Sequence, residues 1–543
     1  MAVQDALLEQ ARAWRAQDPD PVTRDELDEL VDAGDLEGLR DRFGSRLAFG
    51  TAGLRGELGA GPNRMNRVLV SQAAGGLAAY LVDRYDDPSI VIGYDGRVNS
   101  DVFARDTAVI MAGAGVRAVL LPRRLPTPVL AFAVRHLGVS AGVMVTASHN
   151  PARDNGYKVY LGGEDGGSQI VPPADGLIAQ RIADVATRSI AELPRSNAFT
   201  LADESVLDAY VRQTAALRTG PTDIRFVYSA MHGVGWETAS RVFEAAGFPA
   251  PTSVVEQQEP DASFPTVAFP NPEEPGAMDL AFAAAQAAGA DLAIVNDPDA
   301  DRLGVAIPDA AGWRRLSGNE VGTLLGWRAA ERTKKGTLAA SIVSSPALRT
   351  LAEAHGLPYA DTLTGFKWIS RVGGLAFGYE EALGYLVDPG KVRDKDGISA
   401  AVDFLAMAAE LKAEGRTVAD RLDEFTQRFG AFASGQVSLR VDDLSDIGRM
   451  MAALRAQPPA SVGGLAVDRI DDFIDGFEGY PPGDILRLWI GGSRVIVRPS
   501  GTEPKLKVYL DAFSDEGSVE ERKGAAAEVI AKLEAGMREL LQA

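Results

Sequence analysis

Residues 142–151 read G-V-M-V-T-A-S-H-N-P, an apolar run that stops at a polar loop. The apolar part, 142–145, is typical of a buried strand, because a strand covered on both faces is hydrophobic at consecutive positions. The loop then places a small serine, Ser148, beside His149, one of the chain's four histidines. A strand that ends in a polar loop and leads on to a helix recurs along the chain, and this recurrence decides the fold class.

Strands and helices alternate on both sides of this stretch. The predicted strands are 90–93, 118–121, 142–145, 224–228, 292–295, 338–343 and 375–379. The predicted helices are 102–114, 129–136, 236–246, 277–288, one near 320, and 346–355. Such alternation predicts mostly parallel, doubly wound sheets. After about residue 430 the pattern favours antiparallel strands, at 437–441, 485–490, 495–497 and 506–510, and then a long helix at 517–541.

The chain's 543 residues are too many for one hydrophobic core. We expect three doubly wound mixed α/β domains and a smaller α+β C-terminal domain around a central cleft. The predicted boundaries are 1–205, 206–317, 318–430 and 431–543. Residues 1–45 read as polar helices, and the acids that follow Thr23 indicate a helix start with this threonine as its cap.

Composition narrows the class of protein. Asp and Glu number 75 against 55 Lys and Arg, and a net charge of −20 argues against a nucleic-acid or anionic-membrane partner. The chain has no cysteine, which excludes disulfides, thiolate zinc sites and cysteine nucleophiles. The N-terminal residues lack a signal-peptide pattern, and no apolar run approaches the roughly 20 residues that span a bilayer. We expect a cytoplasmic enzyme.

The Ser148 loop has two interpretations. An esterase nucleophile would sit in a G-x-S-x-G elbow, which is absent here. A Ser–His pair is awkward, because adjacent residues of an extended chain, such as Ser148 and His149, point to opposite sides. From these residues alone, a polar turn without catalytic function remains open.

A second polar loop, N-D-P-D-A-D-R, directly follows the predicted strand 292–295. Asp297, Asp299 and Asp301 alternate, so in an extended segment their carboxylates would converge on one side. Three such acids repel one another unless a cation neutralises them, and hard divalent cations prefer oxygen ligands. An EF-hand loop would need glycine and glutamate where the chain has Arg302 and Pro308. A solvated acidic turn remains an alternative, but Mg²⁺ is favoured.

Two further loops carry polar groups. F-G-Y-E-E-A-L-G-Y contains Glu380 and Glu381, which could accept hydrogen bonds from sugar hydroxyls or simply begin a helix. R-P-S-G-T-E-P-K-L-K combines a guanidinium, two hydroxyls, a glycine and two ammonium groups, at Arg498, Ser500, Thr502, Gly501, Lys505 and Lys507. In so acidic a chain this basic island indicates a phosphate site, with a tight turn as the alternative.

With these four loops in this order, the sequence resembles the α-D-phosphohexomutase superfamily, which comprises the phosphoglucomutases and phosphomannomutases. The resemblance covers nearly the whole chain. F-G-T-A-G-L-R-G at 49–56, the earlier D-P-x-x-x-T-R-x-E-L pattern and T-G-F-K-W-I at 364–369 look most similar to the type-2 phosphoglucomutase and phosphopentomutase branch.

The resemblance implies a mutase that interconverts the 1-phosphate and 6-phosphate of glucose or mannose through a phosphoserine and a sugar bisphosphate. It implies that Ser148 is the phosphoserine and that its oxygen holds Mg²⁺ together with Asp297, Asp299 and Asp301. It also implies catalytic roles for Arg55, His149, Lys158 as general base, and Arg302. The implied substrate contacts are Thr364, Gly365, Lys367, Glu380, Glu381, Arg498, Ser500, Gly501, Thr502 and Lys507.

One position departs from the pattern: Ala382 stands where many hexomutases have serine, which leaves the preferred hexose open. The alternatives are a phosphopentomutase acting on ribose or deoxyribose 1-phosphate and a sugar bisphosphate synthase. A phosphatase and a non-catalytic sugar-phosphate-binding relative are further possibilities. The expected partner is a phosphorylated monosaccharide, with a sugar bisphosphate as activator, and the expected assembly is a monomer or homodimer. His232 could line the cleft.

Overall fold

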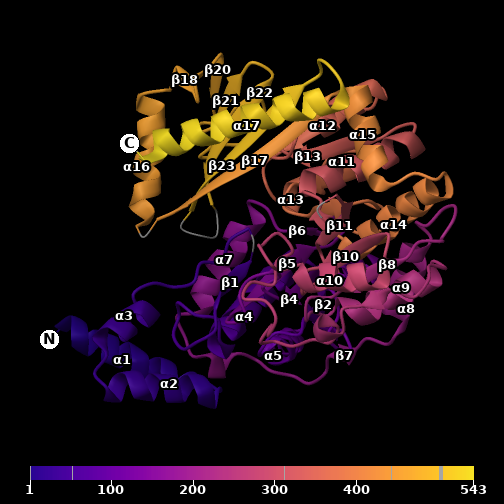
Figure 1. Cartoon of the computed structure of the whole chain (residues 1–543). Helices are drawn as coiled ribbons and strands as arrows, with labels where there is room; N and C mark the ends of the chain where they lie inside the picture. Colours follow the sequence, from indigo (N-terminus) through magenta and orange to yellow (C-terminus); the bar gives the residue numbers. More distant parts are fainter. Residues whose placement is uncertain (1, 52, 311, 442, 501–504, 543) are drawn as a thin grey trace. The chain divides into compact units, whose positions relative to one another are not determined.

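The structure is a computed structural model that describes residues 2–51, 53–310, 312–441, 443–500 and 505–542 (Figure 1). The chain packs as two compact units. Unit 1 comprises Met1–Leu316 and Leu383–Ala413, and unit 2 comprises Ser317–Ala382 and Glu414–Ala543. The predicted boundaries of four domains stay a prediction.

Three helices begin unit 1: α1 (Ala2–Gln17), α2 (Pro21–Asp32) and α3 (Leu36–Phe43). The predicted cap at Thr23 is wrong. Asp20 caps α2 by accepting a hydrogen bond from the Val22 amide at 3.0 Å, and Pro21 occupies the first helical position. Proline is favoured there because its missing N–H costs nothing in the first turn. Thr23 instead lies inside the helix and donates to Asp18 at 2.6 Å.

The first sheet has the order β1-β5-β4-β2-β3-β7, with β6 beside β5. Its strands are β1 (Leu54–Glu57), β2 (Ser89–Tyr94), β3 (Arg117–Leu120), β4 (Ala141–Val145), β5 (Asp154–Leu161), β6 (Ser168–Gln169) and β7 (Thr200–Leu201). The helices around it are α4 (Arg67–Arg84), α5 (Ser100–Gly113), α6 (Thr127–His136), α7 (Ala174–Val185) and α8 (Ser205–Ala215). Strands β2, β3 and β4 are parallel, and β5 is antiparallel to β4. Strand β4 is buried throughout, as its apolar run predicts.

The second sheet of unit 1 has the order β12-β11-β10-β8-β9. Its strands are β8 (Phe226–Ser229), β9 (Thr252–Ser253), β10 (Leu292–Asn296), β11 (Leu303–Asp309) and β12 (Gly312–Arg315). Helices α9 (Gly235–Ala245) and α10 (Asp279–Ala288) belong to it, as does the buried helix α14 (Gly397–Ala413), which packs on β10 and β11. Strand β16 (Gly384–Leu386) also lies in unit 1.

Unit 2 begins with α11 (Gly318–Arg332), whose start is fixed by a capping box of Ser317 and Glu320. Its first sheet contains β13 (Thr337–Ser341) between β14 (Tyr359–Thr362) and β15 (Leu375–Glu380), all parallel. Helices α12 (Ala347–Ala354), α13 (Phe366–Ile369) and α15 (Val418–Phe429) accompany it.

The C-terminal sheet has the order β17-β23-β22-β21-β20, and its neighbouring strands are antiparallel. The elements are β17 (Ala431–Arg440), α16 (Leu444–Ala456), β18 (Ser461–Val462), β19 (Leu465–Ala466), β20 (Arg469–Asp472), β21 (Leu486–Ile490), β22 (Ser493–Pro499), β23 (Lys505–Ser514) and α17 (Val519–Gln542). Helix α17 packs along β17 and β23 (Figure 1). Mixed α/β sheets followed by an α+β C-terminal part confirm the predicted fold class.

A buried ion pair ties the C-terminal sheet to the first sheet of unit 2. Arg494 on β22 donates to Asp511 on β23 at 2.8 Å and also to the carbonyl of Ser344, just after β13. Asp511 accepts a further hydrogen bond from Ser434 at 2.7 Å. Breaking a buried pair on one side is costly, because the remaining charge stays without a partner. The two sheets of unit 2 are therefore firmly connected.

Among the helices that the structure describes, none has the length and apolar character needed to cross a membrane.

The contact between α4 and α7 generates a stability prediction. A Cβ added at Gly76 would lie 2.6 Å from the backbone nitrogen of Ile182, so we expect Gly76→Ala to destabilise the protein by about 1–3 kcal/mol through overpacking. The matched control is Gly176→Ala in α7, where an added Cβ meets no atom within 4 Å. Calorimetric unfolding of the full chain should separate the two variants, and equal transition temperatures would contradict the packing argument.

Candidate active site

Ser148 lies in a strained loop at the carboxyl end of β4. Its φ of 53° falls in the left-handed region, which residues other than glycine rarely adopt. The Ser148 amide donates to Thr146 Oγ1 at 2.8 Å, and the side chain is buried. The Ser148 hydroxyl donates to Asp297 Oδ2 at 3.0 Å, although 149 positions separate the two residues in the chain. The two polar loops that follow β4 and β10 therefore meet at this hydrogen bond.

Arg97 fixes the shape of the Ser148 loop. Its buried guanidinium donates to the carbonyl oxygens of Ser148 at 2.6 Å, Asn150 at 2.5 Å, Pro151 at 2.7 Å and Asp154 at 3.0 Å. The fixed fork of an arginine can satisfy several carbonyls at once, whereas a lysine is a point donor. Burial lowers the pKa of Arg97, and the nearby carboxylates, first that of Asp95, oppose this effect.

The three aspartates lie on a turn rather than on an extended segment, so the predicted local geometry is wrong. Ala300 has a φ of 56°, and its amide donates to the carbonyl of Asp297 at 2.8 Å. In an extended chain, alternate residues are about 6–7 Å apart. The turn draws the carboxylates closer, and one oxygen from each of Asp297, Asp299 and Asp301 lies within 4.8 Å of the others.

Several basic groups surround the aspartate turn. Lys158 Nζ lies 2.8 Å from Asp299 Oδ2 and 2.9 Å from Asp301 Oδ2, and Lys395 Nζ lies 3.3 Å from Asp301 Oδ2. Burial disfavours the charge of Lys158, but Asp299 and Asp301 raise its pKa above the ordinary value. Burial and the charges of Asp299 and Asp301 raise the pKa of Asp297 well above its ordinary value. The three acids of the turn outnumber the two lysines that contact them.

The donor set of the turn fits a hard divalent cation. All three aspartates are fully buried, and the Oδ1 atoms of Asp299 and Asp301 have no hydrogen-bond partner among the described residues. Buried carboxylate oxygens without a partner are costly unless they bind a cation. The Ser148 hydroxyl, 3.0 Å from Asp297, is placed to add a fourth oxygen. These residues could hold a metal ion.

A framework of hydrogen bonds keeps the aspartate turn in place. The Thr127 hydroxyl donates to Asp299 Oδ2 at 2.6 Å, and the Thr127 amide donates to the Asp299 carbonyl at 2.9 Å. Asn296 accepts from the Tyr228 hydroxyl at 2.8 Å and donates to the carbonyl of Arg302 at 2.6 Å. Such contacts behind the carboxylates matter because they orient the ligand atoms.

Three more residues of the predicted site gather near Ser148. Arg55, on β1, donates to Asn150 at 3.2 Å. His149 is close enough to Arg302 and Arg55 that their charges, after the larger effect of burial, lower its pKa well below the ordinary value. Its Nδ1 has no hydrogen-bond partner among the residues described. Arg302 pairs with Gly384 in an isolated bridge, and its amide donates to Asp297 at 2.9 Å.

The predicted sugar contacts lie in unit 2. Thr364 and Gly365 form the loop before α13, Lys367 lies in α13, and Glu380 ends β15. Glu381 is held by the hydroxyls of Ser341 at 3.0 Å and Ser344 at 3.2 Å. The Glu381 carboxylate is therefore oriented by its own unit.

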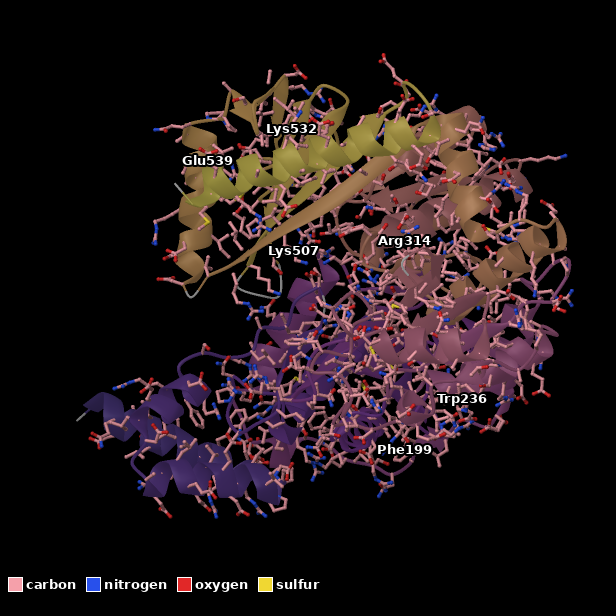
Figure 2. The ribbon with its side chains drawn as sticks, viewed as in Figure 1. Phe199, Trp236, Arg314, Lys507, Lys532 and Glu539 are labelled. Atoms are coloured by element: carbon pink, nitrogen blue, oxygen red, sulfur yellow. The ribbon has the colours of Figure 1, made fainter. Side chains whose placement is uncertain are left out.

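The predicted phosphate loop also lies in unit 2. Arg498 on β22 pairs across the sheet with Lys507 on β23. Figure 2 labels Lys507. The Ser500 amide donates to the Lys505 carbonyl at 2.8 Å. Gly501 and Thr502 lie outside the described residues. Burial and the charges of Glu381 and Glu380 raise the pKa of Tyr509, while Arg498 opposes them.

Sequence reasoning missed three residues that the structure places at the site: Arg97, Thr127 and Lys395. Arg97 is distant in sequence from the loop it supports, and Thr127 begins an ordinary helix. Lys395 follows Asp394, a carboxylate that accepts from Tyr160 at 2.8 Å and Gln169 at 2.7 Å. The charged run K-V-R-D-K-D at 391–396 was the available signal in the sequence, and the structure shows that most of these charges are buried. His232, which could have lined the site, has its ring hydrogen-bonded to Thr266 at 2.8 Å.

Comparison with known families identifies four consecutive matches. They are phosphoglucomutase/phosphomannomutase α/β/α domain I over residues 46–189, domain II over 208–312, domain III over 317–429 and the C-terminal domain over 439–529.

Individual relatives are similar over most of their length. A Haemophilus influenzae protein named "Probable phosphomannomutase" is 56% identical over 483 residues, which cover 88% of this chain and 98% of the relative. The phosphopentomutase of Mus musculus is 34% identical over 575 residues, covering 95% and 92% of the two chains. The crystal structure of a phosphoglucomutase/phosphomannomutase family protein from Burkholderia thailandensis shares the fold, with a TM-score of 0.72 at 20% identity over 92% of this chain and 97% of the other.

The contact between Thr127 and Asp299 generates a prediction about metal binding. Thr127→Val removes the hydroxyl donor but keeps the shape, so we expect Mn²⁺ affinity to fall by about tenfold or more. Chelator-treated chain would be titrated with Mn²⁺, and the free ion followed by electron paramagnetic resonance. Thr127→Ser keeps the hydroxyl and should bind like the wild type. Unchanged affinity in Thr127→Val would show that this hydrogen bond does not orient the ligand.

Proposed function

The chain belongs to the phosphoglucomutase/phosphomannomutase family, and from this premise we propose that Ser148 carries the phosphoryl group during the reaction. The enzyme is a sugar phosphate mutase, an intramolecular phosphotransferase whose substrate is a phosphorylated monosaccharide. Its substrates in this proposal are the 1-phosphate and 6-phosphate of glucose, mannose or both.

One observation carries the proposal: the Ser148 hydroxyl donates to an aspartate of the buried turn. Ser148 is held there in a left-handed conformation by the Thr146 and Arg97 contacts. Strain of this kind costs about 1–3 kcal/mol and persists only where surrounding contacts enforce it. A serine without a function would not require a strained backbone that directs its hydroxyl to a buried aspartate.

The proposed step transfers a phosphoryl group between two oxygens. The bond between phosphorus and Ser148 Oγ breaks, and a bond from phosphorus to the free hydroxyl of the sugar phosphate forms. The proton of that hydroxyl passes to Lys158, the base proposed below, and Ser148 Oγ is left as an oxyanion that accepts the next phosphoryl group. The product is a sugar bisphosphate. After it turns round, its other phosphoryl group returns to Ser148, and the isomeric monophosphate leaves. Catalysis of this kind depends mainly on alignment and charge neutralisation.

We assign Mg²⁺ to Asp297, Asp299, Asp301 and the Ser148 oxygen. Bound Mg²⁺ would neutralise charge on the phosphoryl group. Arg302 and Arg55 supply fixed positive charge around the same position, since both interact electrostatically with this cluster. His149, whose pKa is lowered, is neutral at physiological pH and suits hydrogen bonding rather than charge neutralisation.

Lys158 is the proposed general base, and its ion pairs determine when it can accept a proton. Its ammonium is paired with Asp299 and Asp301, which oppose loss of the proton. Lys158 can therefore act as a base only when those carboxylates are engaged by another cation. Lys395 contacts Asp301 as well and helps to keep this carboxylate ionised.

Unit 2 supplies the proposed contacts with the rest of the substrate. Lys367, Glu380 and Glu381 suit sugar hydroxyls, and Arg498, Ser500, Gly501, Thr502 and Lys507 suit the phosphate that does not react. A sugar bisphosphate would restore the phosphorylated enzyme and act as an activator. A cytoplasmic location, a monomeric or dimeric assembly, and the absence of nucleic-acid and membrane partners stay predictions.

A second candidate is a phosphopentomutase. The mouse phosphopentomutase is similar over 95% of this chain, and Ala382 lacks the hydroxyl that many hexomutases present at this position. A pentose phosphate would need fewer hydroxyl contacts than a hexose phosphate.

The nucleophile assignment predicts the behaviour of Ser148→Ala. Without Ser148 Oγ there is no phosphoryl acceptor, so turnover should fall below about one thousandth of wild type. Intact-mass spectra of the wild type should show one phosphoryl group that is lost on incubation with substrate, and the variant should show none. Ser263→Ala, at an exposed serine, is the control and should behave like wild type. A variant that retains a few per cent of activity would remove Ser148 from this role.

The substrate assignment predicts that glucose 1-phosphate or mannose 1-phosphate gives a higher kcat/KM than ribose 1-phosphate. Because a single hydroxyl contact is worth about 0.5–1.5 kcal/mol, Ala382→Ser should change the ratio of kcat/KM for the two hexoses by no more than about tenfold. Parallel assays on the three sugar phosphates with both proteins test this. A preference for ribose 1-phosphate would favour the phosphopentomutase.

A further inference from the structure

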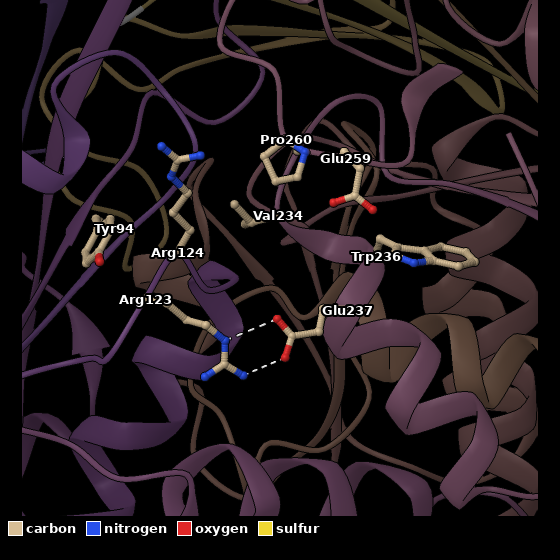
Figure 3. A pocket seen from close by; sticks show the side chains of 9 residues that line it. Tyr94, Arg123, Arg124, Val234, Trp236, Glu237, Glu259 and Pro260 are labelled. Carbon is tan, nitrogen blue, oxygen red and sulfur yellow. Dashed lines mark hydrogen bonds and ion pairs between the residues drawn. The ribbon is translucent and has the colours of Figure 1, made fainter. Parts of the chain in front are cut away.

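A cavity lies within unit 1, and no residue of the Ser148 loop lines it. Its volume is about 320 Å³, at the small end of the roughly 300–1,000 Å³ of ligand pockets. We call it the Arg124 pocket; its main lining residues are Tyr94, Arg124, Val234, Trp236, Glu259 and Pro260 (Figure 3). It forms where the end of β2 and the loops after β3 and β8 meet. Ligands favour this edge, beyond the carboxyl ends of parallel strands.

One wall of the Arg124 pocket is locked by ion pairs. Arg123 donates to Glu237 at 3.2 and 2.5 Å and to Glu204 at 3.1 Å. Figure 3 shows this pair, with the Arg124 side chain turned away from it. Arg123 and Glu237 therefore neutralise each other and contribute little net charge to a ligand.

Unlike Arg123 and Glu237, Arg124 and Glu259 form no ion pair among the described residues. Among the described residues, the exposed Arg124 guanidinium makes no hydrogen bond or ion pair, and Glu259 accepts only from Gln258, at 3.0 Å. The Tyr94 hydroxyl and the Trp236 indole N–H are likewise without a hydrogen-bond partner in the described parts of the chain. A lone guanidinium in a chain with a net charge of −20 matches an anion, and phosphate suits its fork.

The remaining groups match a polyol. A carboxylate such as Glu259 accepts hydrogen bonds from hydroxyls, and the Tyr94 and Trp236 side chains can donate to ring and hydroxyl oxygens. The Trp236 ring also provides an apolar surface for the C–H face of a sugar. We propose that the Arg124 pocket is a second, non-catalytic site for a monosaccharide phosphate. The proposal rests on the groups of the pocket, and on the proposed function only for the supply of such a ligand.

The walls of the Arg124 pocket continue into the aspartate turn. The Val234 amide donates to the Pro298 carbonyl at 2.8 Å, and a Cβ at Gly233 would lie 2.2 Å from Pro298 Cα. On the other side, Thr127 follows Arg124 by three residues and holds Asp299. A ligand that moves either wall would act on the turn, so the site is placed to let sugar phosphate regulate the enzyme.

Fluorine NMR of the full chain labelled with 5-fluorotryptophan tests the proposal, because two of its six tryptophans report on the two sites. Trp236 lines the Arg124 pocket, and Trp368 follows Lys367 in α13. Metal is removed to prevent turnover, and the probes are glucose 6-phosphate, inorganic phosphate and glucose. The signals are assigned with Trp236→Phe and Trp368→Phe.

We expect glucose 6-phosphate to shift the Trp236 signal saturably, inorganic phosphate to bind more weakly, and glucose to bind more weakly still. Arg124→Ala should raise the dissociation constant read at Trp236 by at least about tenfold and leave that at Trp368 unchanged. Arg188→Ala, at an exposed arginine outside the pocket, should change neither.

Each contrary result is distinct. If glucose 6-phosphate shifts the Trp368 signal but not the Trp236 signal, the second site is overturned and the proposed function is left intact. Equal affinity for inorganic phosphate and glucose 6-phosphate would overturn the sugar part of the proposal. A response at Trp236 with none at Trp368 would support the second site and count against the proposed substrate contacts of unit 2.

Discussion

The burial of three carboxylates on one turn is the constraint on which the rest of unit 1 depends. Asp297, Asp299 and Asp301 are each fully buried, and such a concentration of charge is tolerated only beside cations. The two lysines that approach the turn come from distant segments, Lys158 from β5 and Lys395 from the loop before α14. The antiparallel pairing of β5 with β4 therefore brings the positive charge of Lys158 to the turn. The return of residues 383–413 to unit 1 brings that of Lys395.

Backbone strain gathers at the same place. Residues other than glycine adopt left-handed conformations at Ser148 and Ala300, and again at Met231 and His232 in the loop whose next residue packs on Pro298. Each such conformation is sustained by contacts that leave little alternative, such as the carbonyl contacts of Arg97 and the amide of Val234. These strained conformations lower the stability of the fold but fix the geometry of the site, as is typical of sites that act on a substrate.

The sequence allowed much of this to be predicted, because local pattern determines local structure. The apolar runs before Ser148 and Asp297 identified β4 and β10, and the polar loops that follow them do meet. The turn geometry of the aspartates was not predictable from alternation, since Ala300 gives no sign of its left-handed conformation. Arg97 was missed for a different reason: its partners are carbonyl oxygens some fifty positions away, and backbone acceptors have no residue-type signature.

The return of the chain to unit 1 also has a consequence for synthesis on the ribosome. Helix α14, which is almost wholly buried against β10 and β11, belongs to unit 1 but is translated after residues 317–382 of unit 2. The cover that α14 provides for β10 and β11 is missing until residue 413 has been translated, so the packing of the second sheet is completed late. Domains that fold as continuous segments escape this delay. The interleaved order thus ties the completion of unit 1 to the prior synthesis of a segment of unit 2.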